Sequence, residues 1–241
     1  WIIIQVLSAA ALPLGFRLFR HLPDRGYALA KPLGLLLVTY LFWLLGMLGL
    51  LRNTTGSIVF CAVIVAAVSI YLYQRGRDAG LSLTAFLRSH WKLVLFTEVI
   101  FLIGFAIWAL YRAYNPEISA TEKPMEFAFL NGILRSDRFP PLDPWLSGFA
   151  ISYYYFGYVM VAVLTRLSGV PSSIAFNLGI ALLFALTLIG TFSVVYNLVV
   201  AYLRRRASGA QRADAGGTVP GTALGFGLLG AWVVTIAGNL E

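Results

Sequence analysis

Long runs of apolar residues, separated by short polar segments, make up most of this chain. Several of the runs reach the roughly 20 residues that a helix needs to cross a bilayer. The runs that we predict to be membrane spans are 2–19, 32–51, 57–73, 93–111, 149–167, 174–203 and 219–237. The pattern therefore predicts an all-α fold, a polytopic transmembrane helical bundle of about seven spans.

The polar segments divide the chain into three parts. Residues 1–112 hold the first four predicted spans, residues 113–148 form a long acidic loop, and residues 149–241 hold the other three spans. We expect a short interfacial helix in the polar segment 74–92 and a flexible basic linker at 204–217. The chain does not begin with Met and stops just after an apolar run, so we expect it to be a piece of a longer protein.

Composition supports a membrane location and indicates which classes of molecule the protein binds. Hydrophobic residues make up 59% of the chain and charged residues 12%, whereas soluble domains carry roughly 25% charged residues. The net charge of +8 does not indicate nucleic-acid binding, because the basic residues cluster in short loops between apolar runs. Cations in such loops set membrane topology and contact lipid phosphates. We therefore expect membrane lipids, and no nucleic acid, as partners.

The distribution of lysine and arginine predicts the orientation in the cell membrane. Basic residues are concentrated in the first and third loops, which places these loops in the cytoplasm and the acidic loop 113–148 outside it. They are Arg17, Arg20, Arg25, Lys31, Arg75, Arg77, Arg88 and Lys92. If the fifth and sixth spans both cross, the arginine run 204–206 lies outside, against the same rule. We prefer two full crossings, and the alternative is that one of these spans is re-entrant or interfacial.

Acidic residues are concentrated beside the membrane, in the segment 115–158. Five of the ten acidic residues of the chain lie there, namely Glu117, Glu122, Glu126, Asp137 and Asp143. The sequence on both sides of this segment is strongly apolar. A hydrophobic protein that gathers its carboxylates in one loop is predicted to use that loop for chemistry or binding.

A short helix is predicted within this loop, from residue 122 to residue 134. Thr121 is the expected N-cap, and Pro124 falls in the first turn, where proline is tolerated. Apolar residues recur at helical spacing, so we expect the helix to lie flat on the membrane. Glu122 and Glu126 are four residues apart and share one face. Two such carboxylates can bind a divalent cation such as Mg²⁺ or Mn²⁺, or divide acid and base roles; the alternative is an ordinary solvated helix face.

A proline-rich turn precedes the fifth predicted span. Asp143 is held between Leu142 and Pro144 in the sequence FPPLDPW, in which three prolines favour a stiff, extended turn. A rigid acid at the mouth of a span is a candidate ligand or base. The alternative is an Asp-Pro turn in which the carboxylate has a capping role.

Aromatic residues follow this turn, and we expect them to contact a ligand or the membrane surface. They are Trp145, Tyr153, Tyr154, Tyr155 and Tyr158. They can form a wall that stacks on a sugar or a lipid headgroup, or they can belong to an interfacial aromatic belt. Three consecutive tyrosines on a helix would spread over most of its circumference, which favours a mixed role.

One acid lies inside a predicted span. Glu98 is in the fourth apolar run, and an intramembrane acid is a candidate functional group. It is close enough to the inner interface to pair with Lys92 or Arg88, which is the interpretation that we prefer. Three amide side chains are expected to hydrogen-bond between helices: Asn131, Asn177 and Asn197.

The motifs around the acidic loop resemble those of a known family. Over nearly its whole length the chain resembles the "YYY" membrane proteins of Chloroflexi and archaea, on the segments EKPMEFAFLNGILRS, FPPLDPWLSG and ISYYYFGY, with LPDRGYALAKPLGLLL and GNL. That family is in turn similar to the membrane glycosyltransferases of the C superfamily (GT-C), which take a sugar from a polyprenyl-phosphate donor. Their first large extracytoplasmic loop carries an acidic motif, followed by a Pro-Pro element that leads into the next span.

The resemblance implies a role for each charged residue of the loop. Glu122 would be the general base or a metal-coordinating acid, with Glu126 and Asp143 as secondary acids. The cations that would neutralise the donor phosphate are Lys123, Arg135 and Arg138. The implied function is therefore glycosyl transfer from a lipid-linked sugar, in a GT-C-like fold.

Two other functions remain as alternatives. The chain would serve as a non-catalytic subunit of a larger membrane complex if the acidic loop docks a partner and the aromatic residues pack against lipid or a cofactor. It would be a transporter if its helices are broken and carry buried charges near the bilayer midplane, and Glu98 is the candidate for such a charge.

Overall fold

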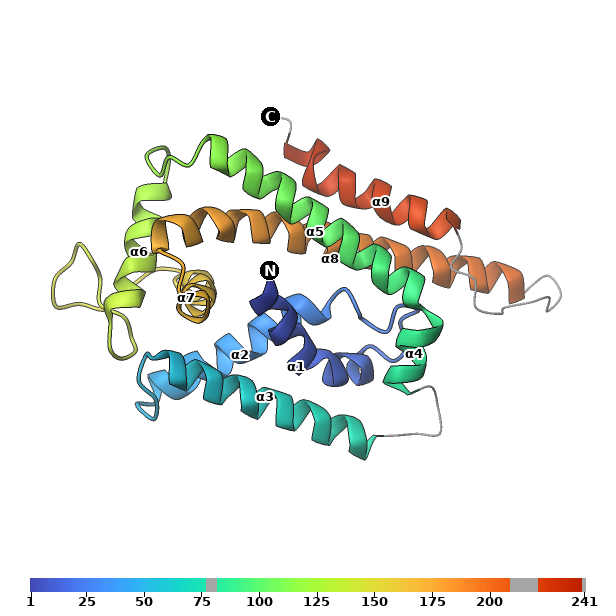
Figure 1. Cartoon of the computed structure of the whole chain (residues 1–241), viewed down its shortest axis with the longest axis horizontal. Coiled ribbons are helices and arrows are strands. Elements are labelled where there is room, and N and C mark those ends of the chain that lie inside the picture. Colours follow the sequence, from blue (N-terminus) through green and yellow to red (C-terminus); the bar gives the residue numbers. More distant parts are fainter. Residues whose placement is uncertain (77–81, 209–220, 240–241) are drawn as a thin grey trace.

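The computed structural model describes residues 1–76, 82–208 and 221–239, and in this part of the chain nearly all regular structure is helical (Figure 1). The helices are α1 (Ile2–Leu18), α2 (Ala30–Met47), α3 (Thr55–Arg75), α4 (Leu83–Ser89), α5 (Trp91–Tyr114), α6 (Lys123–Arg135), α7 (Phe156–Ser168), α8 (Ser172–Ser208), α9 (Gly221–Thr235) and the 3₁₀ turn η1 (Ala237–Asn239). The predicted all-α fold is confirmed. Most of the predicted basic linker, 209–217, lies outside the described residues, as do the first residues of the seventh predicted span.

The long helices lie side by side along one direction of the molecule (Figure 1). The helix α8 packs against α5 and α9, and α1 packs against α2 and α3. Four helices of the described part, α2, α3, α5 and α8, are long and apolar enough to cross a membrane, whereas α1, α7 and α9 are apolar but shorter. The polytopic helical membrane protein that the apolar runs predicted is therefore what the structure contains.

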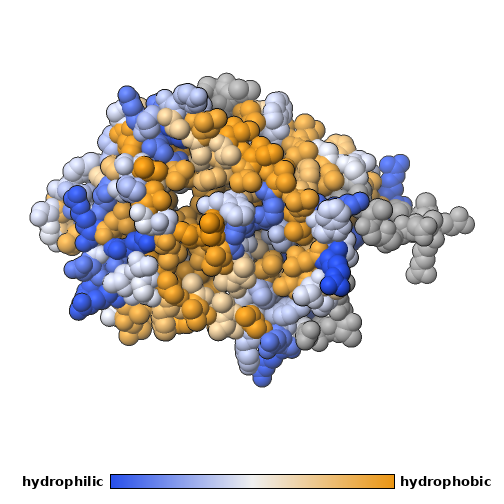
Figure 2. Space-filling model, in the orientation of Figure 1, coloured by the Kyte–Doolittle hydropathy of each residue, from blue (hydrophilic) through white to orange (hydrophobic). Residues whose placement is uncertain are grey.

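The surface supports the same arrangement. Figure 2 shows hydrophobic residues over most of the middle of the molecule and hydrophilic residues gathered mainly towards its two ends. Large apolar side chains on the outer faces of the spans are exposed in the isolated chain, for example Val63, Ile107 and Leu183. Such a band is expected where lipid tails, rather than water, contact the protein.

Two short helices, α4 and α6, lie across opposite ends of the bundle (Figure 1). Both fall where the polar pattern predicted them, α4 within 74–92 and α6 within the acidic loop. The inner face of α6 is apolar, because Phe129, Leu130 and Ile133 recur at helical spacing and are buried against the core. The acidic end of the molecule is therefore closed by an amphipathic helix.

The fifth predicted span differs from the prediction. Its helix, α7, begins at Phe156 and not at residue 149, because residues 149–155 form a turn that pairs with the proline-rich segment through Leu142 and Ala150. With 13 residues, α7 is about 20 Å long, short of the roughly 30 Å of a bilayer core. In Figure 1 α7 is seen end-on, while the long helices run across the view.

The direction of α7 bears on the conflict between the number of predicted crossings and the position of the arginine run 204–206. The helix α8 runs from the α6 end of the bundle to the α4 end, so its basic last turns, with Arg204, Arg205 and Arg206, lie at the same end of the molecule as α4 (Figure 1). Arg17 lies at the same end, because its Nη1 donates to the carbonyl oxygen of Leu72 near the end of α3. The short α7, which lies across the direction of the long helices, favours the alternative in which the fifth predicted span does not cross fully, and the number of crossings stays a prediction.

Candidate functional site

The helix α6 carries the predicted paired glutamates at its first turn. Glu122 occupies the N-cap position without a side-chain capping bond. The prediction that Thr121 caps the helix is wrong, because its backbone has φ 57° and its hydroxyl donates to the carbonyl oxygen of Ala120. Pro124 lies in the first turn, as predicted, where it needs no helical hydrogen-bond donor.

The two glutamates have different surroundings. Glu122 is exposed, whereas Glu126 is half-buried and its Oε1 accepts a hydrogen bond of 3.3 Å from the hydroxyl of Tyr158 on α7. Packing of α6 against α7 brings these two side chains together from positions 32 residues apart. Glu126 is thus held in position by a second helix, while Glu122 is free to meet solvent or a ligand.

Glu126 and Tyr158 also line an apolar cavity of about 310 Å³. Its remaining walls come mainly from α7 and α8, with aliphatic or aromatic side chains that include Leu130, Met160, Leu164, Phe176, Ile180 and Leu186. We call this cavity the α7–α8 groove. It places one carboxylate and one phenol at the side of a space that is otherwise suited to hydrocarbon.

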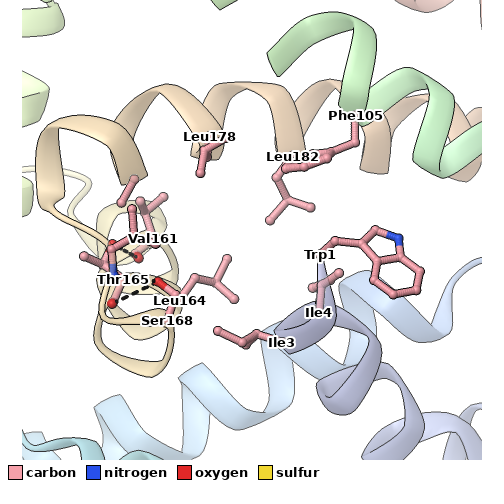
Figure 3. Close-up of a pocket in the computed structure, with 13 residues that line it drawn as sticks. Trp1, Ile3, Ile4, Phe105, Val161, Leu164, Thr165, Ser168, Leu178 and Leu182 are labelled. Atoms are coloured by element: carbon pink, nitrogen blue, oxygen red, sulfur yellow. Dashed lines mark hydrogen bonds between the residues drawn. The ribbon is translucent and has the colours of Figure 1, made fainter. Parts of the chain in front are cut away.

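A second apolar cavity, of about 150 Å³, adjoins the α7–α8 groove. Val161, Leu164 and Leu182 line both spaces. Figure 3 shows how side chains from α7, α8, α5 and α1 point into this second cavity, Phe105 and Leu182 from one side and Ile3 and Ile4 from another. The apolar space beside Glu126 therefore extends towards the centre of the bundle.

Aromatic rings surround Phe129 on the inner face of α6. Its ring centroid lies 5.9 Å from that of Trp145, 5.6 Å from that of Tyr153 and 6.0 Å from that of Tyr158. Partial desolvation raises the pKa of the Tyr153 phenol above its ordinary value, and the nearby carboxylate of Glu122 adds to the shift. Tyr153 therefore stays protonated, and can donate a hydrogen bond, at neutral pH.

The three consecutive tyrosines do not lie on a helix, contrary to the prediction, because all three precede α7. Tyr153 joins the cluster around Phe129, and Tyr154 is 83% exposed. The hydroxyl of Tyr155 accepts a hydrogen bond of 2.9 Å from Nε1 of Trp43 on α2. The three tyrosines therefore have different surroundings, and their mixed role in contacting a ligand or the membrane surface stays a prediction.

Asp143 lies apart from the paired glutamates, in the turn before α7. Its Oδ1 accepts hydrogen bonds from the backbone N–H groups of Trp145, at 2.8 Å, and Leu146, at 2.9 Å, which is the geometry of an aspartate turn. Asp143 and Arg135 line a separate cavity of about 330 Å³ on another face of α6. The structure therefore does not gather the three predicted acids in one place.

The remaining predicted cations lie along α6 and the turn that follows it. Lys123 is half-buried beside Glu122, and Arg135 and Arg138 are exposed. Within the described residues there is no group of three or more His, Cys, Asp or Glu side chains that could hold a metal ion. Of the three predicted acids, Glu122 and Glu126 are the two that lie near each other, since the carboxylates of both raise the pKa of Tyr153.

Sequence reasoning missed a buried ion pair between the long helices. Glu98 on α5 pairs with Lys31 of α2 and also accepts hydrogen bonds from Tyr27, at 2.9 Å, and Gln5, at 2.6 Å. The preferred pairing of Glu98 with Lys92 or Arg88 is therefore wrong. The sequence does show a lysine, Lys31, at the start of an apolar run. The spacing of apolar residues does not specify which helices pack together, so Glu98 could not be identified as its partner.

All three predicted amide side chains make hydrogen bonds to other parts of the bundle. Asn131 of α6 accepts from Ser172 of α8, and Asn197 of α8 hydrogen-bonds the carboxylate of buried Asp24. Asn177 of α8 accepts two hydrogen bonds from Arg112 of α5. The predicted interhelical hydrogen bonds are confirmed for Asn131 and Asn177, whereas Asn197 bonds a residue of the loop between α1 and α2; Asp24 and Arg112 were not predicted.

The fold and this acidic end define a class: a multi-pass helical membrane protein with an amphipathic helix and an apolar groove at one end. Comparison with family models is more specific, because the family described as "Uncharacterized membrane protein (DUF2298)" matches residues 37–241. The chain belongs to this family. It matches no curated protein and no solved structure.

Proposed function

We propose that the protein is a membrane glycosyltransferase that uses a polyprenyl-phosphate-linked sugar as donor. The observation that carries the proposal is the position of Glu126, a half-buried carboxylate that lines the apolar α7–α8 groove. A polyprenyl tail is pure hydrocarbon, so burial in such a groove is favourable by the hydrophobic effect. The carboxylate then lies where the polar head of a lipid-linked sugar leaves the apolar space.

The aromatic cluster beside Glu126 supports a sugar as the head of the ligand. Trp145 is 64% exposed and Tyr153 is 40% exposed, so both rings present a face to a ligand as well as to Phe129. The protonated phenol of Tyr153 supplies a hydrogen-bond donor for a sugar oxygen. Rigid aromatic side chains that combine an apolar face with a polar tip suit a ligand of this kind.

Glu126 is our candidate for the general base of the reaction. It accepts the proton of an acceptor hydroxyl while the hydroxyl oxygen forms a bond to C1 of the donor sugar. The bond between C1 and the phosphate oxygen breaks, and its electron pair leaves on the polyprenyl phosphate. Tyr158 is a positioning residue, because its hydroxyl donates to Glu126 and fixes the carboxylate on the groove side of α6.

The leaving phosphate requires positive charge, which Lys123 and Arg138 at the same end of the molecule can supply. A divalent cation is a further source, and Glu122 with Glu126 fits it, because Mg²⁺ typically takes one or two carboxylates together with substrate phosphates. When bound, Mg²⁺ or Mn²⁺ would neutralise the phosphate. Asp143 has a structural role in this account, since its Oδ1 already holds the turn before α7.

The proposal predicts the effect of removing single carboxylates in membranes that contain a labelled polyprenyl-phosphate sugar. Glu126→Gln is expected to lower the transfer rate by about 100-fold or more, because a general base contributes a factor of this size. Tyr158→Phe should lower kcat by about tenfold with little change in KM, since it removes one hydrogen bond to the base. The measurement is the rate of sugar transfer at matched protein levels.

The control is Asp137→Asn, which removes an exposed carboxylate of the same loop that does not line the groove. It should transfer sugar at the parent rate. An unchanged rate in Glu126→Gln would contradict the role of Glu126. Loss in Glu122→Gln with full activity in Glu126→Gln would assign the base to Glu122 instead.

A further inference from the structure

A buried arginine lies at the acidic end of the molecule without a carboxylate partner. Arg112, in the last turn of α5, is 6% exposed. No Asp or Glu side chain of the described residues is within ion-pair distance of its guanidinium. Burial of a cation is costly unless it is hydrogen-bonded and paired, so an anionic ligand beside Arg112 would stabilise the buried charge.

The protein contacts of Arg112 use only part of its guanidinium. Nε donates to Oδ1 of Asn177 at 2.8 Å, and Nη2 donates to the same oxygen and, at 3.3 Å, to the carbonyl oxygen of Glu117. The two N–H groups of Nη1 have no acceptor among the described residues. An arginine held along one edge in this way presents its other edge for a planar or tetrahedral anion.

The guanidinium lines a cavity of about 330 Å³ between α5 and α8. Ser173, Ile174 and Asn177 of the first turns of α8 line the same space. The N-terminus of a helix favours negative charge, because its first backbone N–H groups have no partner within the helix. A buried guanidinium and the start of a helix therefore converge on one cavity.

The other walls of this cavity are apolar and continue towards the interior. Ala109, Ala113 and Ile118 line it, and Leu178 lines both this cavity and the central cavity of Figure 3. In Figure 3 Leu178 points from α8 into the central space, on the same side as Leu182. An anion bound at Arg112 would thus have hydrocarbon-lined space behind it, between two membrane spans.

We propose that Arg112 and the first turn of α8 bind the phosphate group of a membrane lipid. The two free N–H groups of Nη1 and the hydroxyl of Ser173 would donate to phosphate oxygens, and the tail would lie against Leu178 and the apolar walls. This site is separate from the α7–α8 groove, so the inference goes beyond the proposed function. The phosphate itself is common to a polyprenyl phosphate, a phospholipid and inorganic phosphate.

Native mass spectrometry of the purified protein in detergent tests this site with three probes: a polyprenyl phosphate, phosphatidylglycerol and inorganic phosphate. Arg112→Gln is expected to weaken binding of one of the lipids by about tenfold or more, since charge-assisted hydrogen bonds to phosphate are lost. The matched control is Arg52→Gln, an exposed arginine in the turn between α2 and α3, which should bind lipid as the parent does.

A second variant keeps the test informative if Arg112→Gln fails to fold. Ser173→Glu leaves the hydrogen bonds of Arg112 intact and adds a charge that a helix N-terminus tolerates. It should abolish lipid binding by repulsion, whereas the uncharged Ser173→Gln, which replaces the hydroxyl donor by an amide donor, should bind lipid more weakly than the parent but more tightly than Ser173→Glu. Parent-like binding in both Arg112→Gln and Ser173→Glu would overturn the proposal, and so would inorganic phosphate binding without any lipid binding.

The same measurement separates this inference from the proposed function. Glu126→Gln should bind lipid at Arg112 as the parent does, because Glu126 lines a different cavity. Arg112-dependent lipid binding without sugar transfer from any donor would contradict the proposed function and leave the lipid site standing. Parent-like lipid binding and sugar transfer in Arg112→Gln would contradict the lipid site alone.

Discussion

At the scale of single residues, the chain concentrates its buried charge in a few contacts between helices. Lys31 has a side chain that is 1% exposed and pairs with Glu98, which also accepts from Tyr27 and Gln5. These four residues come from α1, the loop after it, α2 and α5. These contacts hold separate parts of the bundle together. Removal of one partner of the ion pair leaves the other charge buried and unpaired.

Removal of the lysine is predicted to destabilise the protein. Lys31→Met leaves Glu98 without its cation, and breaking a buried pair in this way costs about 3 kcal/mol or more of unfolding free energy. The double variant Lys31→Met with Glu98→Leu should recover most of that loss, because neither charge remains. Denaturant unfolding in detergent micelles measures both, and a single variant as stable as the parent would contradict the pairing.

At the scale of elements, the spacing of apolar residues predicted the helices that local sequence determines. It did not predict features that depend on how the helices pack together. The spans, the short helix α4 and the amphipathic α6 follow from apolar spacing and polar breaks along the chain. The late start of α7 could not be predicted in this way, because residues 149–155 are apolar and aromatic yet pair with the proline-rich turn. The partner of Glu98 depends on which helices touch, which spacing does not specify.

The candidate site was predicted in part for the same reason. Glu122, Glu126 and Trp145 were identified from their concentration in one loop, and the structure places them at one end of the bundle. The hydrogen bond between Tyr158 and Glu126, and the α7–α8 groove, depend on the packing of α6 on α7 and could not be predicted from the sequence. Arg112 looks in the sequence like one more basic residue at the end of a span, and only its burial distinguishes it.

The contact between α1 and α2 depends on one glycine. A Cβ atom at Gly34 would lie 2.1 Å from the carbonyl oxygen of Leu7, so the two helix backbones approach closely there. Gly34→Ala should force the helices apart and cost about 1–3 kcal/mol of unfolding free energy. Gly190→Ala on α8 meets nothing within 4 Å, so it should be neutral or stabilise the helix by up to about 1 kcal/mol. Equal thermal stability of the two variants in detergent would contradict the close approach.

At the scale of the whole molecule, the basic and acidic segments lie at opposite ends. The basic end of α8 lies at the same end of the molecule as α4, and the acidic loop with α6 closes the other end (Figure 1). Basic residues are retained on the cytoplasmic side of membranes. This arrangement therefore agrees with an extracytoplasmic acidic loop and with a single crossing by α8 between residues 172 and 206.

Labelling of single cysteines tests this arrangement. In a Cys61→Ala background, which lacks the single natural cysteine, Tyr154→Cys should react with a membrane-impermeant thiol reagent in intact cells. Arg206→Cys should react only after the membrane is permeabilised, because α8 separates the two positions. If both cysteines react in intact cells, α7 and α8 both cross and the orientation of α7 described above is wrong.

The central claim is that the α7–α8 groove holds a lipid-linked sugar with its head at Glu126. The most direct measurement is a density map of the protein bound to a polyprenyl-phosphate sugar in a lipid nanodisc. The account predicts elongated density along Leu164 and Phe176 that ends in a headgroup beside Glu126 and Tyr158. A groove filled by a helix of a partner subunit, with the lipid elsewhere, would contradict it and favour a non-catalytic subunit of a larger complex.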